Sequence, residues 1–346
     1  MSRMLEEVRE QPSALARTLA GELRGAERFK KVLERARPRL VVLVARGTSD
    51  NAALFGRYLV EITSGIPVSL AAPSVETLYG ARMDYRGALV VAISQSGEST
   101  DTNLFLERAK QQGALTLGIT NERSSALSRL ADHVLLVRAG KERSVAATKT
   151  YTGQMLALYL LAYALGGAIR IPDLERLPDL VEGSLGLEPE VAELAIRYRY
   201  MRYAVVVGRG LVYSNAFEFA LKLMETCYVV AERFSSADFM HGPIALVEPS
   251  FPVFAFTPSG VTWKSMDETL AKLDALQAEI IAITDPSNRE VEARATKLIR
   301  LPRPIKPLLA PIPYIVPAQL FAASLAAEKG LDPDKPRTLS KVTLTI

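Results

Sequence analysis

The stretch "RLVVLVARGTSDNAALFGRYLVEITSG", residues 39–65, passes from a short apolar run into a longer amphipathic one. A short apolar run that ends at glycine is typical of a buried strand, and the longer run is typical of a helix. The same order returns where "GALVVAIS" (87–94) precedes "TDTNLFLERAKQQG" (100–113), and "ALTLGITN" (114–121) follows as a third strand. Strands that alternate with crossover helices predict a parallel sheet with helices on both faces.

The second half of the chain repeats this pattern. "YAVVVGRG" (203–210) resembles "VVLVARG" (41–47), "FPVFAFTPSG" (251–260) resembles "LVVAISQSG" (89–97), and "AEIIAITD" (278–285) resembles the third strand. Three matches in the same order are hard to ascribe to chance. They indicate an internal duplication.

The spacing between strands also agrees between the halves. Gly47 and Ser94 are 47 positions apart, and so are Gly210 and Thr257. We therefore predict an α/β fold of two tandem doubly wound domains, each a parallel sheet with helices on both faces. The predicted division is an N-terminal helical segment (1–31), a first domain (32–172), a helical connector (173–195), a second domain (196–337) and a C-terminal tail (338–346).

The composition narrows the class of function. The chain is 49% hydrophobic and 23% charged, which is ordinary for a globular protein, and its net charge of +4 is spread without a dense basic block. This favours an anionic small molecule over nucleic acid. One cysteine and two histidines make a metal cluster improbable, and we expect no metal or organic cofactor. The start has no signal-peptide pattern, and the longest apolar run, 155–169, is shorter than the roughly 20 residues of a membrane span, so we predict a buried helix there and a cytoplasmic protein with no membrane contact.

The loop "SQSGEST" (94–100) separates the two halves chemically. The first half has this full hydroxyl cluster, whereas the second half reads "TPSG" (257–260). A feature needed for folding alone would be present in both halves. Simple capping of the next helix would need one serine or threonine. Hydroxyls and glycine at the carboxyl end of a strand and the start of a helix predict a phosphate site, and "RGTSD" (46–50) would line the same crevice.

Neither loop matches the glycine patterns of nucleotide-binding sites. A phosphorylated small molecule is therefore the expected ligand.

Six stretches taken together resemble a known family. In chain order they are "GTS", "SQSGEST", "VAATKTYT", "FALKLME", "AERFSSADFMHGPIAL" and "DPDKPRTLSK". They resemble the double-SIS (sugar isomerase) proteins over nearly the whole chain, including the isomerase half of the glucosamine-6-phosphate synthases. The resemblance implies a phosphorylated amino sugar as the substrate.

The departures favour one branch of this family. The synthases begin with a glutaminase domain, which is expected to be absent here because Met-Ser-Arg leads directly into the sugar half. They also have a cysteine at the position of Arg46 and a lysine at that of Met240. "GRGLVYSNAFEFALKL" and "DPDKPRTLSKVTLTI" look closer to the stand-alone SIS-type glucosamine-6-phosphate deaminases. The resemblance then implies conversion of glucosamine 6-phosphate to fructose 6-phosphate and ammonia.

Three alternatives stay open. Two are enzymes: a protein like the isomerising glutamine–fructose-6-phosphate aminotransferases without the glutaminase domain, and a fructosamine-6-phosphate deglycase. The third is a sugar-phosphate-binding sensor. A sensor would not need the catalytic residues given below, and no DNA-binding helix-turn-helix pattern is evident before residue 30.

The candidate catalytic residues follow from the resemblance. Glu218, Lys222 and Glu225 are spaced i, i+4, i+7 and share a helix face, which by itself would suggest only a solvated Glu–Lys pair. The resemblance implies that Glu225 is the base that moves a proton between C1 and C2, and that Lys222 orients it. It implies that His241 opens the sugar ring, in a homodimer where this loop can serve the neighbouring subunit, and that Lys341 meets the open-chain carbonyl.

The implied substrate contacts lie in both halves. We expect His133 and Lys149 to be structural. The predicted substrate-binding set is Gly47, Thr48, Ser49, Ser94, Gln95, Ser96, Ser99, Val145, Ala146, Glu218 and Ser340.

Overall fold

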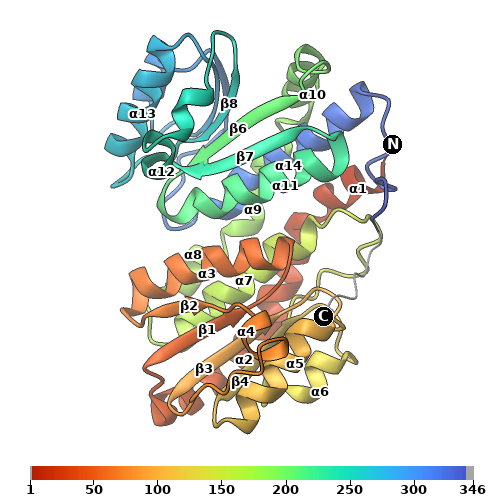
Figure 1. Cartoon of the computed structure of the whole chain (residues 1–346), viewed down its shortest axis with the longest axis vertical. Coiled ribbons are helices and arrows are strands. Elements are labelled where there is room, and N and C mark those ends of the chain that lie inside the picture. Colours follow the sequence, from red (N-terminus) through yellow and green to blue (C-terminus); the bar gives the residue numbers. More distant parts are fainter. Residues whose placement is uncertain (1, 340–346) are drawn as a thin grey trace. The chain divides into compact units, whose positions relative to one another are not determined.

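The computed structural model describes residues 2–339, and these form two compact units (Figure 1). The first unit contains Ser13–Glu142 and Ala147–Glu175. The second unit contains the residues up to Pro12, Arg143–Ala146 and Arg176–Thr338. Two short segments that precede or interrupt the first unit in sequence therefore group with the second.

The first unit is built on one five-stranded parallel sheet with the order β2-β1-β3-β4-β5. The central pair is in register from Leu40 opposite Ala88 to Val44 opposite Ala92. This order is that of a doubly wound sheet and confirms the predicted fold class. The strands are β1 (Leu40–Val44), β2 (Val68–Leu70), β3 (Ala88–Ile93), β4 (Leu115–Thr120) and β5 (His133–Leu136).

Alternating residues of the first sheet pack on opposite sides. Val42 and Val90 join the core that contains Phe105 of α5 (Thr100–Gln111). Leu43 points the other way, toward α3 (Thr48–Ser64) and α7 (Lys149–Ala164). Helices cover both faces, as the near-continuous apolar strands require.

The apolar run predicted as a buried helix forms most of α7, whose residues are almost all buried. The other helices of the first unit are α2 (Gln11–Ala36), α4 (Ser74–Thr77), α6 (Ala126–Leu130) and α8 (Ile171–Leu174).

The second unit repeats the arrangement. Its five parallel strands have the order β10-β9-β8-β6-β7, which is the first sheet's order in the duplicated elements. The strands are β6 (Tyr203–Gly208), β7 (Val230–Ser235), β8 (Pro252–Phe256), β9 (Glu279–Thr284) and β10 (Lys297–Arg300).

One face of the second sheet packs against α12 (Ser236–Met240) and α13 (Trp263–Ala275) through a hydrophobic core that includes Phe239. On the other face, the ring of Phe254 lies 5.0 Å from the rings of Phe219 and Phe321. Phe219 belongs to α11 (Tyr213–Cys227), and Phe321 belongs to α14 (Pro311–Glu328). The aromatic contacts therefore fix the position of α11, which bears the Glu–Lys–Glu face.

The remaining helices of the second unit include two that pack on α14. These are α9 (Leu177–Leu185) and α10 (Glu188–Arg197). The others are α1 (Arg3–Arg9) and the short 3-10 turns η1 (Gly210–Val212), η2 (Pro243–Leu246) and η3 (Glu290–Ala293). Within residues 2–339, no helix combines the length and the apolar character that a membrane crossing needs.

Candidate functional site

The predicted phosphate loops lie at the switch point of the first sheet. β1 and β3 are adjacent, and the strand order runs outward from this pair in both directions, to β2 and to β4. Gly47 and the first residues of α3, Thr48 and Ser49, follow β1, and the loop Ser94–Ser99 follows β3, so both stretches lie at the same carboxyl edge. Ligands of open α/β sheets bind at such a point. We call this pair of loops the hydroxyl crevice.

Three serines of the crevice accept hydrogen bonds and keep their own hydrogens. The N–H of Gly97 donates to Oγ of Ser94 at 3.1 Å, and the N–H of Glu98 donates to Oγ of Ser96 at 3.2 Å. Nε2 of Gln154 donates to Oγ of Ser49 at 2.9 Å. In the part of the chain that the structure describes, no acceptor is seen for these three hydroxyl hydrogens. They remain able to donate to an anion.

In the described part of the chain, the two helices that begin at the crevice, α3 and α5, have no side-chain cap at their N-termini. Ser99 is the N-cap of α5, but among residues 2–339 its side chain caps no helical N–H; its Oγ donates to Oγ1 of Thr102 at 3.0 Å. The N-cap of α3 is Gly47, which has no side chain. First-turn N–H groups carry partial positive charge and suit a phosphate. The cluster is therefore not explained by helix capping.

Gly97 shapes the loop. Its φ is +67°, and a Cβ atom there would come within 2.2 Å of Oγ of Ser125. Nδ2 of Asn103 donates to its carbonyl at 3.0 Å. Glycine is thus required both for the turn and for the close approach of Ser125.

Sequence reasoning missed three residues that support the crevice: Asp101, Asn103 and Gln154. Nε of Arg46 donates to Oδ2 of Asp101 at 2.9 Å, and Nη2 bonds the same oxygen. The Asp101 carboxylate is 2% exposed and the Arg46 side chain 50% exposed. This pair joins the loop after β1 to the first turn of α5. Gln154 and Asn103 each hold one crevice loop in place, as described above.

The Glu–Lys–Glu face of α11 is a buried ion cluster. Nζ of Lys222 lies 2.6 Å from Oε2 of Glu225 and 3.4 Å from Oε1 of Glu218. Lys222 and Glu218 are almost completely buried, while Glu225 is 22% exposed. The interpretation as a solvated pair is therefore wrong. Burial lowers the pKa of Lys222, but the charges of Glu218 and then Glu225 outweigh it and raise the pKa above its usual value, so the ammonium persists.

The end of α11 is tied to the C-terminal segment. Tyr228 caps the helix with φ +51°, and its hydroxyl accepts the N–H of Arg337 at 2.8 Å. The Arg337 guanidinium stacks 4.4 Å from the centre of the same ring. This contact fixes the start of the tail on which Ser340 and Lys341 follow. Those two predicted site residues lie outside the described residues.

His241 follows α12 as its C-cap and is exposed, with its N–H donating to the carbonyl of Asp238 at 3.1 Å. Its assigned role in ring opening stays a prediction. His133 packs 4.7 Å from the ring of Phe29. Lys149 is buried, and its Nζ donates to the carbonyl of Lys141 at 2.9 Å.

The loop 143–146, which contains Val145 and Ala146, groups with the second unit. Ala146 is fully buried and Val145 partly so. The two residues before Val145, Arg143 and Ser144, each donate their backbone N–H to the carboxylate of Glu7. The predicted substrate residues thus fall into three groups: the hydroxyl crevice, the loop 143–146 and the face of α11.

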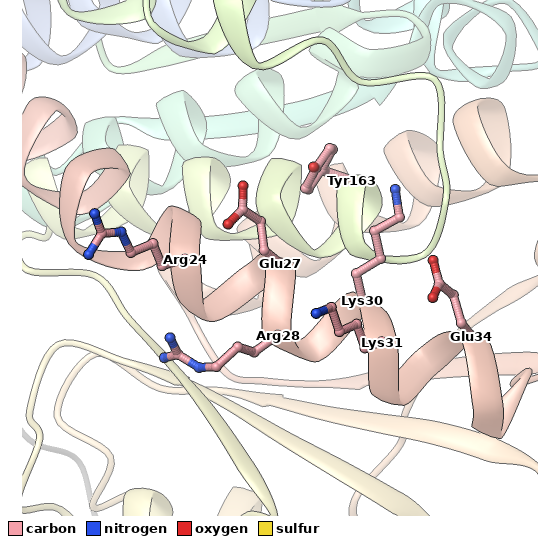
Figure 2. Close-up of a pocket in the computed structure, with 7 residues that line it drawn as sticks. All are labelled: Arg24, Glu27, Arg28, Lys30, Lys31, Glu34 and Tyr163. Carbon is pink, nitrogen blue, oxygen red and sulfur yellow. The ribbon is translucent and has the colours of Figure 1, made fainter.

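A groove of about 550 Å³ runs along α2 (Figure 2). Four basic and two acidic side chains of α2 line it, and Nζ of Lys30 lies 4.9 Å from the ring centre of Tyr163 on α7. Because the groove is lined by both acidic and basic side chains, its charge does not indicate a particular class of ligand. Within the described residues, no group of three or more His, Cys, Asp or Glu side chains is arranged to hold a metal ion.

Comparison with known proteins identifies the fold family. The model of the SIS domain matches residues 35–164 and again 201–329. The chain belongs to the SIS domain family. The two sheets are therefore the first and second SIS copies, and the resemblance read from the motifs is confirmed.

Individual relatives are consistent with this assignment. The glutamine–fructose-6-phosphate aminotransferase (isomerizing) of Pyrococcus horikoshii is 38% identical over 345 residues, which cover 98% of this chain and 57% of the relative. The chain thus spans little more than half the length of such relatives. The C-terminal domain of the Francisella tularensis glucosamine-fructose-6-phosphate aminotransferase superposes with a TM-score of 0.88 at 29% identity, covering 97% of this chain and 98% of that domain.

A third relative is a ketose/aldose isomerase. The tagatose-6-phosphate isomerase of Escherichia coli superposes with a TM-score of 0.85 at 25% identity, covering 98% of this chain and 96% of that one.

Proposed function

We propose that this chain is a phosphosugar isomerase that acts on an amino-sugar phosphate. The observation that carries the proposal is the hydroxyl crevice, where three serine hydroxyls and two helix N-termini without a side-chain cap among the described residues lie at the switch point of one sheet. Such donors suit a phosphate group without needing a lysine. The charged face of α11 supplies the second requirement, a carboxylate that is partly exposed and oriented by a buried ammonium.

The residues support a proton-transfer mechanism. Glu225 would take the proton from C2 of open-chain glucosamine 6-phosphate and return it to C1, through an enolamine. This gives an imine at C2, to which water adds and from which ammonia leaves. His241 would move a proton between the ring oxygen and the anomeric hydroxyl, and Lys222 holds the Glu225 carboxylate at 2.6 Å. Fructose 6-phosphate and ammonia are the products.

The direction of nitrogen transfer is the finer part of the proposal. The deaminase direction follows from the motifs of the chain. The aminotransferases among the relatives favour the alternative, in which the same residues aminate fructose 6-phosphate with ammonia. We infer that the isomerisation step is common to both directions, and that the homodimer implied by the motifs would bring in His241.

One assay panel tests this. The purified chain is incubated with glucosamine 6-phosphate, or with fructose 6-phosphate and ammonium, in D₂O. We expect deuterium at C1 of fructose 6-phosphate where that is the product and at C2 of glucosamine 6-phosphate where that is the product, and no turnover of unphosphorylated glucosamine. Equal turnover of the sugar with and without phosphate would contradict the crevice assignment.

Glutamine distinguishes the nitrogen source. Burial raises the pKa of the chain's single cysteine, Cys227, to about 11, so its thiol is not a nucleophile at neutral pH. We expect no glutamate from glutamine and fructose 6-phosphate. Glutamate production by this chain alone would contradict the use of ammonia.

A further inference from the structure

Helix α1 begins on the C-terminal segment. The N–H groups of Arg3 and Met4 donate to Oδ2 and Oδ1 of Asp334 at 2.7 and 2.8 Å. Both carboxylate oxygens therefore cap the first turn, where a negative charge is favourable. Asp334 lies four residues before Thr338, in the segment that leads to Ser340 and Lys341.

The other end of α1 holds the loop 143–146. Oε1 of Glu7 accepts the N–H of Arg143 at 2.5 Å, and Oε2 accepts the N–H of Ser144 at 3.1 Å. Glu7 is 4% exposed, so these charge-assisted bonds form away from water. They fix two consecutive peptide groups immediately before Val145 and Ala146.

The helix between these two attachments is firmly seated. Met4 and Val8 are fully buried. Nη2 of Arg9 lies 2.5 Å from Oε1 of Glu188 on α10. A rotation of α1 would have to break the apolar contacts and this ion pair together with the two attachments.

We propose that Glu7 is a positioning residue for the loop 143–146, and that α1 couples this loop to the C-terminal segment through Asp334. The effect on turnover rests on the proposed function, in which Val145 and Ala146 contact the sugar. The mechanical coupling does not, because every contact that carries it lies within the second unit. The consequence is that one helix holds both the loop 143–146, near the middle of the chain, and the C-terminal segment at Asp334.

Hydrogen exchange tests the attachment directly. In Glu7→Gln the side-chain amide presents a donor to one of the two N–H groups, so the amides of Arg143 and Ser144 should exchange about ten- to hundredfold faster. The matched control is Glu6→Gln, because Glu6 is exposed on the same helix. Unchanged exchange in Glu7→Gln overturns the attachment.

Asp334→Asn tests the coupling. It should speed exchange of the amides of Arg3 and Met4 and also, through α1, those of Arg143 and Ser144. If the amides of Arg3 and Met4 exchange faster while those of Arg143 and Ser144 exchange as in the wild type, the coupling is overturned. If Glu7→Gln does not fold, Asp334→Asn decides the proposal alone.

Kinetics separate positioning from general damage. Glu7→Gln should raise KM for the sugar phosphate about tenfold but leave the inhibition constant of inorganic phosphate unchanged, because the hydroxyl crevice is intact. If KM for the sugar phosphate and the inhibition constant of inorganic phosphate rise by the same factor, the positioning role is overturned. Wild-type protein that binds neither ligand contradicts the proposed function, and the exchange experiments then still decide the coupling.

Discussion

In the first SIS copy, the hydroxyl oxygens of Ser94 and Ser96 accept backbone N–H groups and keep their hydrogens for a ligand. In the second copy, the hydroxyl of Thr257 donates to the carbonyl of Ile283 at 2.9 Å, and that of Thr284 donates to the carbonyl of Thr257 at 3.2 Å. The hydroxyls of Ser94 and its counterpart Thr257 thus have opposite hydrogen-bond polarity, whereas Thr120, the first-copy counterpart of Thr284, also donates to a backbone carbonyl, that of Gln95, at 3.3 Å. Ser94 and Ser96 of the first copy keep their hydroxyl hydrogens available to a ligand, whereas Thr257 of the second copy donates its hydroxyl hydrogen to a backbone carbonyl.

Charge reinforces the difference. Asp285 is fully buried at the end of β9, and its Oδ2 accepts the hydroxyl hydrogen of Tyr314 at 2.7 Å. Burial, followed by the charge of Asp285, raises the pKa of Tyr314, which therefore stays a donor. A buried carboxylate beside this switch point would repel a phosphate. The duplication gives the same fold twice, and under the proposed function the second copy would contribute the face of α11 instead of a phosphate site.

The largest effect should come from that face. Glu225→Gln keeps the side-chain size but removes the base, so kcat should fall about 10²- to 10⁴-fold while KM changes little. The fold should survive, because Lys222 keeps the buried carboxylate of Glu218 as its partner. Turnover and deuterium incorporation from D₂O would be measured on protein checked by thermal melting. Wild-type turnover in a folded variant would place the base elsewhere.

The crevices themselves provide a matched pair. Ser96→Ala removes a hydroxyl that can donate to the phosphate, and KM should rise about ten- to hundredfold with a smaller change in kcat. Ser259→Ala makes the same change at the corresponding position of the second copy and should leave KM unaltered. Initial rates over a range of substrate concentration decide this. Equal effects of the two substitutions would remove the distinction between the crevices.

The sequence predicted much of this architecture because the informative contacts are local. The alternation of strand and helix located both sheets, although the strand predicted at 87–94 extends only over Ala88–Ile93. The hydroxyl crevice was predictable because a strand end and the following helix are adjacent in sequence. The bond between Gln154 and Ser49 spans 105 positions and left no local signal.

Burial was the other quantity hidden from the sequence. Spacing put Lys222 and Glu225 on one face of α11, but whether that face met water depended on how the helix packs in the second unit. The phosphate loop, the ring-opening role of His241 and the imine role of Lys341 stay predictions.

One arginine follows the first strand of each copy, Arg46 after β1 and Arg209 after β6, and their substitutions should differ in their effect on stability. Arg46→Ala leaves the buried Asp101 without its ionic partner and should destabilise the first unit by about 1–3 kcal/mol. Arg209→Ala removes only a contact of 3.4 Å between Nη1 and Oγ of Ser235, and should cost less than about 0.5 kcal/mol. Denaturant midpoints of the two variants provide the measurement. Adding Asp101→Asn to the first variant should recover part of the loss, and no recovery would show that the ion pair is not the cause.

The smallest effect concerns the edge strands. His133 begins β5 opposite Leu117, and Lys297 begins β10 opposite Ile281, so they are counterparts in the duplication. Burial lowers the pKa of His133 below its ordinary 6.5, although the charge of Asp132 opposes this shift. The folded state therefore prefers the neutral imidazole, and its contribution to stability is present above the ordinary pKa and is lost as the pH falls. Its counterpart Lys297 is exposed.

We therefore expect the first unit to lose stability as the pH falls below the ordinary histidine pKa of 6.5, more steeply in the wild type than in His133→Leu. The reason is that the leucine variant keeps an apolar contact with Phe29 and has no proton to bind. Lys297→Leu should leave the pH dependence of the second unit unchanged. Hydrogen exchange of the β4 amides reports the first unit and that of the β9 amides the second, so each unit is measured separately. Identical pH slopes for wild type and His133→Leu would show that burial of this imidazole has no energetic consequence, and the edge strands of the two copies would then be equivalent.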